Sequence, residues 1–102
     1  MKIGIIGAGA MGSGIAEVAA TAGNEVILYD NFVGASGKFQ KGLDKNLAKL
    51  LEKQKITQEK ASSIKKNIHF VSHLDGFKDC ELVIEAIIEN INFEIRIIHP
   101  YS

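Results

Sequence analysis

The chain has 102 residues, of which 46% are hydrophobic and 24% charged, with twelve acidic side chains against twelve basic ones. This length suits one small domain, and the neutral charge gives no electrostatic footprint for nucleic acid. No apolar run reaches the roughly 18 residues of a membrane span, and the N-terminus has no secretory-signal pattern. We therefore expect a cytoplasmic protein without nucleic-acid or membrane partners.

The first predicted element is a short apolar strand over residues 2–6, which leads into the turn Gly7-Ala8-Gly9-Ala10-Met11-Gly12. Gly7 permits a tight strand-to-helix turn, Gly9 lets the backbone approach a pyrophosphate, and Gly12 lets the next helix pack closely. Free N–H groups at the helix start, together with the helix dipole, favour the negative charge of phosphates. We expect these six residues to bind a dinucleotide.

A helix is predicted near residues 11–22. Its apolar residues recur at three- and four-residue spacing, which predicts one buried face made of Met11, Ile15, Val18, Ala19 and Ala22. Gly23 and Asn24 then end the helix. The buried face implies that this helix lies against a sheet.

The strand predicted at residues 25–29 ends at Asp30, at about the 20-residue spacing from the glycine turn that a dinucleotide fingerprint requires. A carboxylate at this position accepts hydrogen bonds from the adenosine ribose hydroxyls and repels a 2′-phosphate. Asn31 stands where an NADP enzyme would usually have an arginine, so the pattern favours NAD. The alternative is that Asp30 only caps or ends the strand.

Two helices are predicted next, near residues 36–54 and 57–66. The first carries a lysine at every fourth position, namely Lys41, Lys45, Lys49 and Lys53, and this basic stripe has two interpretations. It could hold phosphates, or it could be the solvated side of an amphipathic helix whose buried side contains Leu43, Leu47, Leu50 and Leu51.

Strands at residues 68–71 and 82–86 complete a predicted parallel sheet of order 3-2-1-4, in which the loops after Ile6 and Ala86 face one crevice. The lone Cys80 is expected to be a small buried residue before the last strand. No ligand spacing joins the three histidines, and we predict no metal site. Without a neighbour, the strand from residue 82 to 88 would be a bare sheet edge, from which we expect self-association.

Three segments carry a family resemblance. The string IGIIGAGAMGSGIAEVAATAGNEVILYD resembles the start of the 3-hydroxyacyl-CoA dehydrogenase family, whose short-chain members include 3-hydroxybutyryl-CoA dehydrogenase. Residues 41–53 resemble that family's long helix after the second strand, and residues 82–90 resemble its fourth strand and following loop. The similarity covers roughly residues 1–92.

The resemblance implies an α/β fold, a Rossmann-type parallel sheet with flanking helices. Only the first half and one strand of the second half are expected within residues 1–102, so the NAD-binding domain is incomplete and the C-terminal substrate and dimerisation domain is absent. The complete enzyme would oxidise (3S)-3-hydroxyacyl-CoA to 3-oxoacyl-CoA with NAD in fatty-acid metabolism. Its partner would be an acyl-CoA, and homo-oligomers or pairing with the missing C-terminal part are further expectations.

The resemblance also implies roles for single residues. Glu89, placed on the loop just past the fourth strand, becomes a cofactor contact, and Lys53 becomes a contact to CoA. Asn46 stands where the family can have a CoA-binding serine, and because the residue differs, no contact to CoA is assigned to it. Glu94 stands where the family commonly has a lysine near the nicotinamide ribose. This reversal of charge means that the chain takes another path after Asn90 or that the site is weakened.

No catalytic residue is assigned, because the family's base, a histidine oriented by a glutamate, and its serine and asparagine would lie beyond residue 102. Residues 91–98 fit a strand and a helix face equally well, and Pro100 stops either. We expect a truncated enzyme that is inactive alone. The alternatives are a non-catalytic NAD-binding fragment and another NAD-dependent hydroxy-acid dehydrogenase on the same fold.

Overall fold

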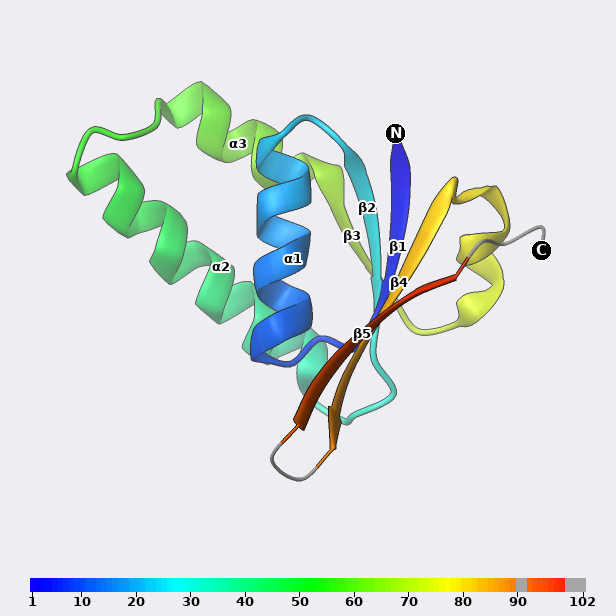
Figure 1. The fold of residues 1–102 in the computed structure, drawn as a ribbon. Helices are drawn as coiled ribbons and strands as arrows, with labels where there is room; N and C mark the ends of the chain where they lie inside the picture. Colours follow the sequence, from blue (N-terminus) through cyan, green and yellow to red (C-terminus); the bar gives the residue numbers. More distant parts are fainter. Residues whose placement is uncertain (90–91, 99–102) are drawn as a thin grey trace.

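The structure, a computed structural model, describes residues 1–89 and 92–98. Its elements in chain order are β1 (Lys2–Ile6), α1 (Ala10–Thr21), β2 (Glu25–Tyr29), α2 (Ala35–Glu52), α3 (Gln58–Asn67), β3 (Ile68–Val71), the 3-10 helix η1 (Leu74–Asp79), β4 (Leu82–Glu89) and β5 (Asn92–Ile98). The described strands form one sheet in the order β3-β2-β1-β4-β5 (Figure 1). The four strands β1 to β4 are parallel, which confirms the predicted 3-2-1-4 order.

The predicted α-helices begin and end within one or two residues of the observed ones, whereas η1 was not predicted. The predicted end of β4 at residue 86 is wrong, since the strand continues to Glu89. The segment that fitted a strand and a helix equally well is a strand over Asn92–Ile98, and Pro100 lies outside the described residues.

The expectation that β4 forms a bare sheet edge is wrong. β5 pairs with it in antiparallel register, from Glu89 opposite Asn92 to Val83 opposite Ile98. Only two residues separate the strands in sequence, which suits a hairpin, whereas a parallel neighbour of β4 needs a crossover of about a dozen residues or more. The edge on this side of the sheet is therefore the outer edge of β5.

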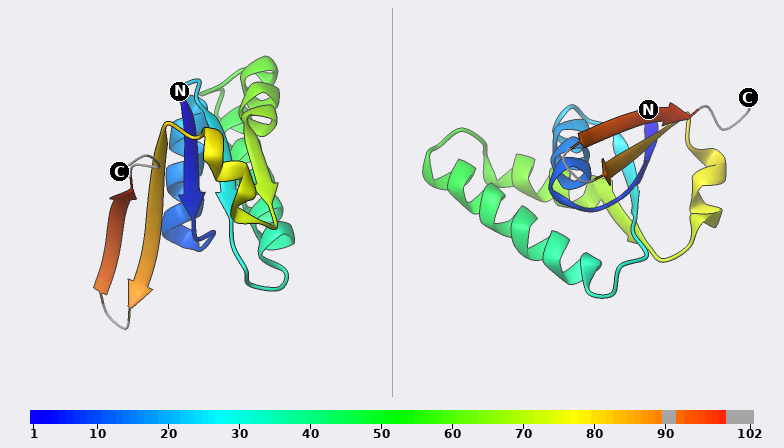
Figure 2. Two further views of the ribbon diagram at one scale, coloured as in Figure 1. Left: turned by 90° about the vertical axis from the view of Figure 1, so that its right-hand side faces the viewer. Right: turned by 60° about the horizontal axis from the view of Figure 1, so that its bottom comes forward.

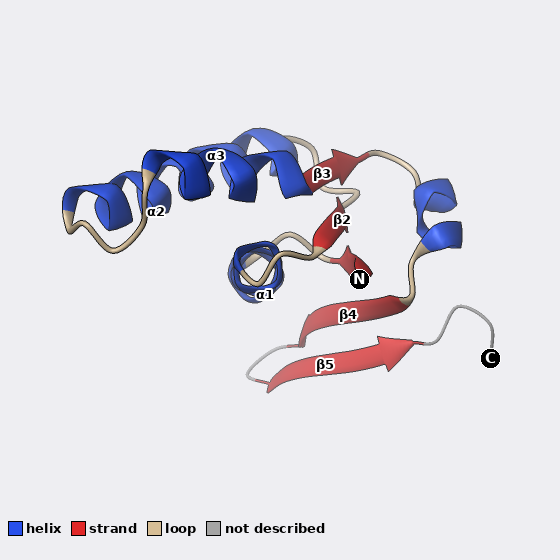
Figure 3. Ribbon diagram, turned by 90° about the horizontal axis from the view of Figure 1, so that it is seen from above, coloured by secondary structure: helices blue, strands red, loops and turns tan. Residues whose placement is uncertain are grey.

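The three α-helices cover one face of the sheet, and η1 lies over the other face (Figure 2, Figure 3). Alternate residues of β1 serve the two sides: Ile3 and Ile5 join the core under the helices, whereas Gly4 faces η1. A Cβ on Gly4 would lie 2.9 Å from the Cδ2 atom of Phe77, so the absence of a side chain there makes room for that ring. No helix within the described residues is long and apolar enough to cross a membrane.

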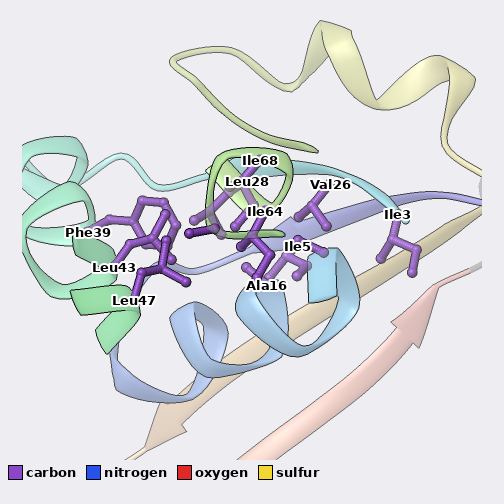
Figure 4. Close-up of a cluster of buried hydrophobic side chains, with 12 residues drawn as sticks. Ile3, Ile5, Ala16, Val26, Leu28, Phe39, Leu43, Leu47, Ile64 and Ile68 are labelled. Atoms are coloured by element: carbon purple, nitrogen blue, oxygen red, sulfur yellow. The ribbon is translucent and has the colours of Figure 1, made fainter. Parts of the chain in front are cut away.

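The main core lies between the sheet and the helices (Figure 4). Its larger side chains come from the strands, from α2 and from α3, and they include Ile5, Val26, Leu28, Phe39, Leu43, Leu47 and Ile64. Leu43 and Leu47 are buried, as the amphipathic interpretation of the lysine-rich helix requires, and the four lysines of its stripe are exposed. The stripe therefore lies on the solvated side of α2, and its binding of phosphates stays a prediction.

α1 meets the sheet through small residues; its predicted buried face is right for Ile15 and Ala19, which are half-buried and pack against the core, and wrong for Val18 and Ala22. The buried residues of α1 are Gly12, Ala16 and Ala20, whereas Val18 is 71% exposed. The reason is the close approach of helix and strand: a Cβ on Gly12 would lie only 1.7 Å from the carbonyl oxygen of Gly7. Larger apolar side chains do not fit on this face, so they lie on its flanks.

Two polar contacts support α3 outside the core, one at its own start and one to α2. The Thr57 hydroxyl accepts a hydrogen bond of 3.1 Å from the Lys60 backbone N–H and caps α3. The Lys65 ammonium lies 2.6 Å from the Asp44 carboxylate, where both side chains are about half exposed. This exposure limits the contribution of the ion pair to below about 1 kcal/mol, so α2 is positioned mainly by its buried side chains.

We predict opposite effects for two glycine substitutions in α1. Gly12→Ala should lower the free energy of unfolding by about 3 kcal/mol, because the new Cβ collides with the Gly7 backbone. Gly14→Ala should raise it by roughly 0.5–1 kcal/mol, because nothing lies within 4 Å of its Cβ and alanine loses less backbone entropy in a helix. Urea unfolding measures both, and equal effects would contradict the close helix–strand contact.

Candidate functional site

Gly7 lies at the carboxyl ends of β1 and β2 and beside the middle of β4. Its φ of 106° lies in the left-handed region that favours glycine, and its N–H donates a 2.8 Å hydrogen bond to the Tyr29 carbonyl at the end of β2. A Cβ on Gly7 would lie 2.6 Å from the carbonyl oxygen of Ala86 in β4. The predicted tight turn is confirmed, and a side chain is excluded there on two grounds.

The start of α1 presents free N–H groups. Gly9 is the N-cap, and the first helical hydrogen bond runs 2.9 Å from the Ser13 N–H to the Gly9 carbonyl. The N–H groups of Ala10, Met11 and Gly12 precede that bond, and the first turn contains no acidic residue. The helix dipole adds positive potential at this end, so the arrangement suits an anionic group.

Asp30 is fixed against the glycine turn by both carboxylate oxygens. Oδ2 accepts a 2.8 Å hydrogen bond from the Ala8 N–H, and Oδ1 accepts a 2.8 Å hydrogen bond from the Phe32 N–H. Asp30 therefore organises the end of β2, as the alternative interpretation expected. Each carboxylate oxygen also has a second lone pair, so the group can still accept hydrogen bonds from ligand hydroxyls.

A cavity of about 660 Å³ opens beside this carboxylate. Its walls are the glycine turn at residues 8–10, the following turns of α1, the loop that begins at Asp30, and the facing side of α2. The volume falls within the range of cofactor pockets. A carboxylate acceptor and a helix start thus share one cavity, which is the combination that a sugar with an attached phosphate requires.

The predicted site residues differ in their position relative to the cavity. Ala8, Gly9, Ala10 and Asp30 line the cavity, whereas Gly7, Met11 and Gly12 do not line it and shape or begin α1. Lys53 lies at the C-cap of α2, beyond the stretch that reaches the cavity, which ends at Asn46.

Glu89 was expected on the loop after β4 and is instead the last residue of that strand, because pairing with β5 lengthens β4. The register places Glu85 beside Ile6 at the end of β1, so Glu89 lies four residues, or roughly 13 Å, beyond that point. Glu94 lies in β5 opposite Ile87. The described chain after Asn90 thus continues as β5, antiparallel to β4, and the two explanations for Glu94 stay predictions.

Several cavity residues were not predicted. Phe32 lines the cavity although its side chain is 73% exposed, and Lys38 and Phe39 enter the wall from α2. The Asn46 amide donates a 3.2 Å hydrogen bond to the Glu17 carboxylate, which links α2 to α1 at the far end of the cavity. Among these residues, the sequence could have indicated only Phe32, an aromatic residue two positions after Asp30. The residues of α2 reach the cavity because of the angle of that helix, which the sequence does not show.

The histidines described by the structure lie away from the cavity. His69 Nε2 is 3.5 Å from the Glu25 carboxylate, near the amino-terminal ends of β2 and β3 and thus at the opposite end of the sheet from Asp30. His73 precedes η1, and His99 lies outside the described residues. No group of three metal-ligating side chains occurs among residues 1–89 and 92–98.

The chain matches a known family along almost its whole length. The family model described as "3-hydroxyacyl-CoA dehydrogenase, NAD binding domain" matches residues 2–100. A probable 3-hydroxybutyryl-CoA dehydrogenase of Deinococcus radiodurans is 44% identical over 90 residues, which are 88% of this chain and 32% of that protein. A 3-hydroxybutyryl-CoA dehydrogenase of Bradyrhizobium diazoefficiens is 38% identical over 98 residues, 96% of this chain and 33% of that protein.

Solved structures agree with the sequence matches. The (S)-3-hydroxybutyryl-CoA dehydrogenase of Ralstonia eutropha superposes with a TM-score of 0.82 at 35% identity, over 87% of this chain and 31% of that one. The 3-hydroxybutyryl-CoA dehydrogenase of Escherichia coli gives 0.82 at 34% identity, over 88% of this chain and 19% of that one. This chain spans about a third of the length of the curated relatives it matches.

Cys80 is excluded from the site by burial. The side chain is 0% exposed, as predicted, and packs with Ile27, Phe77 and Val83. Burial raises the pKa of its thiol, and the nearby Asp79 and Glu25 carboxylates act in the same direction against the opposing Lys2 ammonium. The group therefore remains a protonated, inaccessible thiol at neutral pH.

We predict that Cys80 does not react with an aromatic disulfide reagent at pH 8 while the protein is folded. The rate should rise on the order of 100-fold or more in denaturing urea, because the reagent needs a thiolate and access. The variant Ile97→Cys provides the control, since residue 97 is 60% exposed and its thiol should react at once. Rapid labelling of the native parent chain would contradict the burial of Cys80.

Proposed function

Since the chain belongs to the 3-hydroxyacyl-CoA dehydrogenase family, where it corresponds to the NAD-binding domain, we propose that the cavity beside Asp30 holds the adenosine half of NAD. The observation that carries this assignment is the Asp30 carboxylate, which two backbone N–H groups fix at the cavity wall. Its remaining lone pairs suit the two hydroxyls of an adenosine ribose.

The start of α1 suits the pyrophosphate of the cofactor. Gly9 has no side chain to obstruct the approach, and the N–H groups of Ala10 and Met11 have no helical carbonyl partner. No acidic residue lies in the first turn to repel the phosphates. These residues would bind and orient NAD, and the bound nicotinamide would supply the hydride-accepting chemistry.

The choice of NAD over NADP depends on two side chains in the same cavity. Asp30 repels a 2′-phosphate, whereas Lys38, also in the cavity wall, would attract one. Asp30 is the better placed because its position is fixed by hydrogen bonds, and Lys38 is exposed to solvent on α2. We assign the cavity to NAD on this ground.

The wider activity is a proposal drawn from the family of oxidoreductases to which the chain belongs. A complete enzyme would oxidise (3S)-3-hydroxyacyl-CoA in the cytoplasm, with Lys53 contacting CoA and Glu89 contacting the cofactor. This chain would bind NAD without turning over substrate, because none of its described residues is assigned as a catalytic base. Turnover would require pairing with the part of a complete enzyme that binds acyl-CoA, and a homo-oligomer is a further proposal.

A second candidate is a non-catalytic NAD-binding module. The β4–β5 hairpin favours it, because β5 supplies β4 with a neighbour from within the same short chain. The module and the dehydrogenase share the cofactor site, and a genomic reading frame that continues past residue 102 into a histidine and a glutamate of the family's kind would favour the dehydrogenase. Another NAD-dependent hydroxy-acid dehydrogenase is disfavoured by the family match.

We predict saturable binding of NAD in calorimetric titrations of the purified chain, with NADP at least about tenfold weaker. Asp30→Ala should weaken NAD by roughly tenfold or more, since it removes a charged hydrogen-bond acceptor worth about 1.5–3 kcal/mol. Asp75→Ala, on η1 at the other face of the sheet, is the matched control and should bind as the parent does. Folded parent protein that binds no NAD would refute the assignment.

For the proposed CoA contact, we predict that Lys53→Ala weakens the binding of free CoA by about two- to fivefold, the range for one exposed ion pair. Lys45→Ala removes a lysine of the same exposed stripe and should leave CoA binding unchanged. Equal losses for both variants, measured by calorimetry at fixed ionic strength, would indicate general attraction to the stripe instead of a contact at Lys53.

A further inference from the structure

Phe32 is an aromatic residue in the wall of the cavity. It lies on the connection between β2 and α2, at the same end of the sheet as the start of α1 (Figure 1). Its side chain is 73% exposed. A single exposed apolar residue is common on a protein surface, but one in a cavity wall adds apolar area to a binding site. A molecule bound in the cavity can therefore cover this ring.

The backbone of Phe32 is fixed on both sides of its side chain. Its N–H donates a 2.8 Å hydrogen bond to Oδ1 of Asp30, and its carbonyl oxygen accepts a 3.1 Å hydrogen bond from the N–H of Ala35, the first residue of α2. Gly34 completes the turn between these two bonds with a φ of 84°. The ring is thus attached to a backbone that the Asp30 carboxylate holds in place, which lowers the entropy lost when a ligand binds.

Phe32 is also the available one of the two phenylalanines that line the cavity. The other, Phe39, is 4% exposed and belongs to the main core (Figure 4). Its ring centroid lies 6.1 Å from that of Phe70, so the protein itself covers this ring. Phe32 is outside both buried clusters of the described residues, and its ring remains open to a ligand.

We propose that the ring of Phe32 stacks on the adenine base of the bound cofactor, an assignment that rests on the proposed binding of NAD in this cavity. Two residues of chain span at most about 7 Å, so Phe32 lies within reach of a base attached to a ribose that Asp30 binds. Stacking needs only a flat aromatic face on each partner, and the base and the phenyl ring both supply one.

The cavity then has a separate contact for each part of an adenine nucleotide. Phe32 faces the base, Asp30 accepts from the ribose hydroxyls, and the start of α1 takes the phosphates. None of these contacts involves the nicotinamide. ADP, which contains the base, the ribose and the pyrophosphate, should therefore bind to the chain without the rest of the cofactor.

Val33 provides a matched control for Phe32. It is the next residue in the same loop and is 92% exposed, but it does not line the cavity. If the two residues only formed an apolar surface patch, their substitution would affect the binding of the cofactor equally. A base stacked on Phe32 makes the effect specific to that residue.

Calorimetric titration of the full chain with NAD tests the assignment. Phe32→Ala should raise the dissociation constant roughly 5- to 100-fold, the range for removing an aromatic ring from one stacked base. Phe32→Tyr keeps the ring, and Val33→Ala leaves the cavity intact, so both should bind as the parent does. Because Phe32 lies outside the buried clusters, Phe32→Ala should unfold at the same urea concentration as the parent.

Two negative results have different meanings. If the parent binds NAD and Phe32→Ala binds it equally well, the stacking assignment is wrong and the proposed function stands. If the folded parent binds no NAD, the proposed function is wrong and the stacking assignment fails with it.

Fluorescence can report the stacked base directly, because the sequence contains no tryptophan. Phe32→Trp introduces a single indole, whose emission should be quenched when ADP binds and should not change with nicotinamide mononucleotide, which has no adenine. Val33→Trp places the indole outside the cavity, where ADP should leave the emission unchanged. Failure of ADP to bind, unchanged emission of Phe32→Trp at saturating ADP, or equal quenching at both positions would overturn the assignment.

Discussion

The site depends on the close approach of α1 to the end of β1. The Gly7 carbonyl oxygen lies in the space that a Cβ on Gly12 would need. The distance of 1.7 Å permits only glycine, and it brings the start of α1 directly over the end of β1 and beside Ala86 of β4. This approach sets the Ala8 N–H within 2.8 Å of Asp30 and turns the free end of the helix toward the cavity. The proposed cofactor site thus follows from packing in the fold, since two glycines let a helix and a strand meet.

Much of the fold could be predicted because its signals are local. The strands around Ile5 and Leu28 are short apolar runs, and Gly7 and Gly12 require particular backbone geometry wherever they occur. The buried face of α1 could not be predicted from apolarity, since tight packing selected Gly12, Ala16 and Ala20 over larger residues. The residues of β5 fit both structural periods, and pairing with β4 decided between them.

The candidate site was predictable on one wall only. The glycine turn and Asp30 belong to a contiguous pattern whose parts lie close together in any parallel βαβ unit. The second wall comes from α2, whose angle depends on buried contacts of Phe39, Leu43 and Leu47 with the sheet. No periodicity in the sequence reports that angle, so Lys38 and the Glu17–Asn46 hydrogen bond emerged only in three dimensions.

The central place of β1 in the sheet has a consequence for synthesis on the ribosome. β1 pairs with β2, which follows it closely, and with β4, whose residues emerge much later. All residues that line the cavity lie between Ala8 and Asn46, whereas the Ala86 carbonyl beside the Gly7 turn is synthesised well after Asn46. The elements of the cavity are therefore complete in the nascent chain before the sheet closes, and a ligand bound there would favour native pairing of the strands that follow.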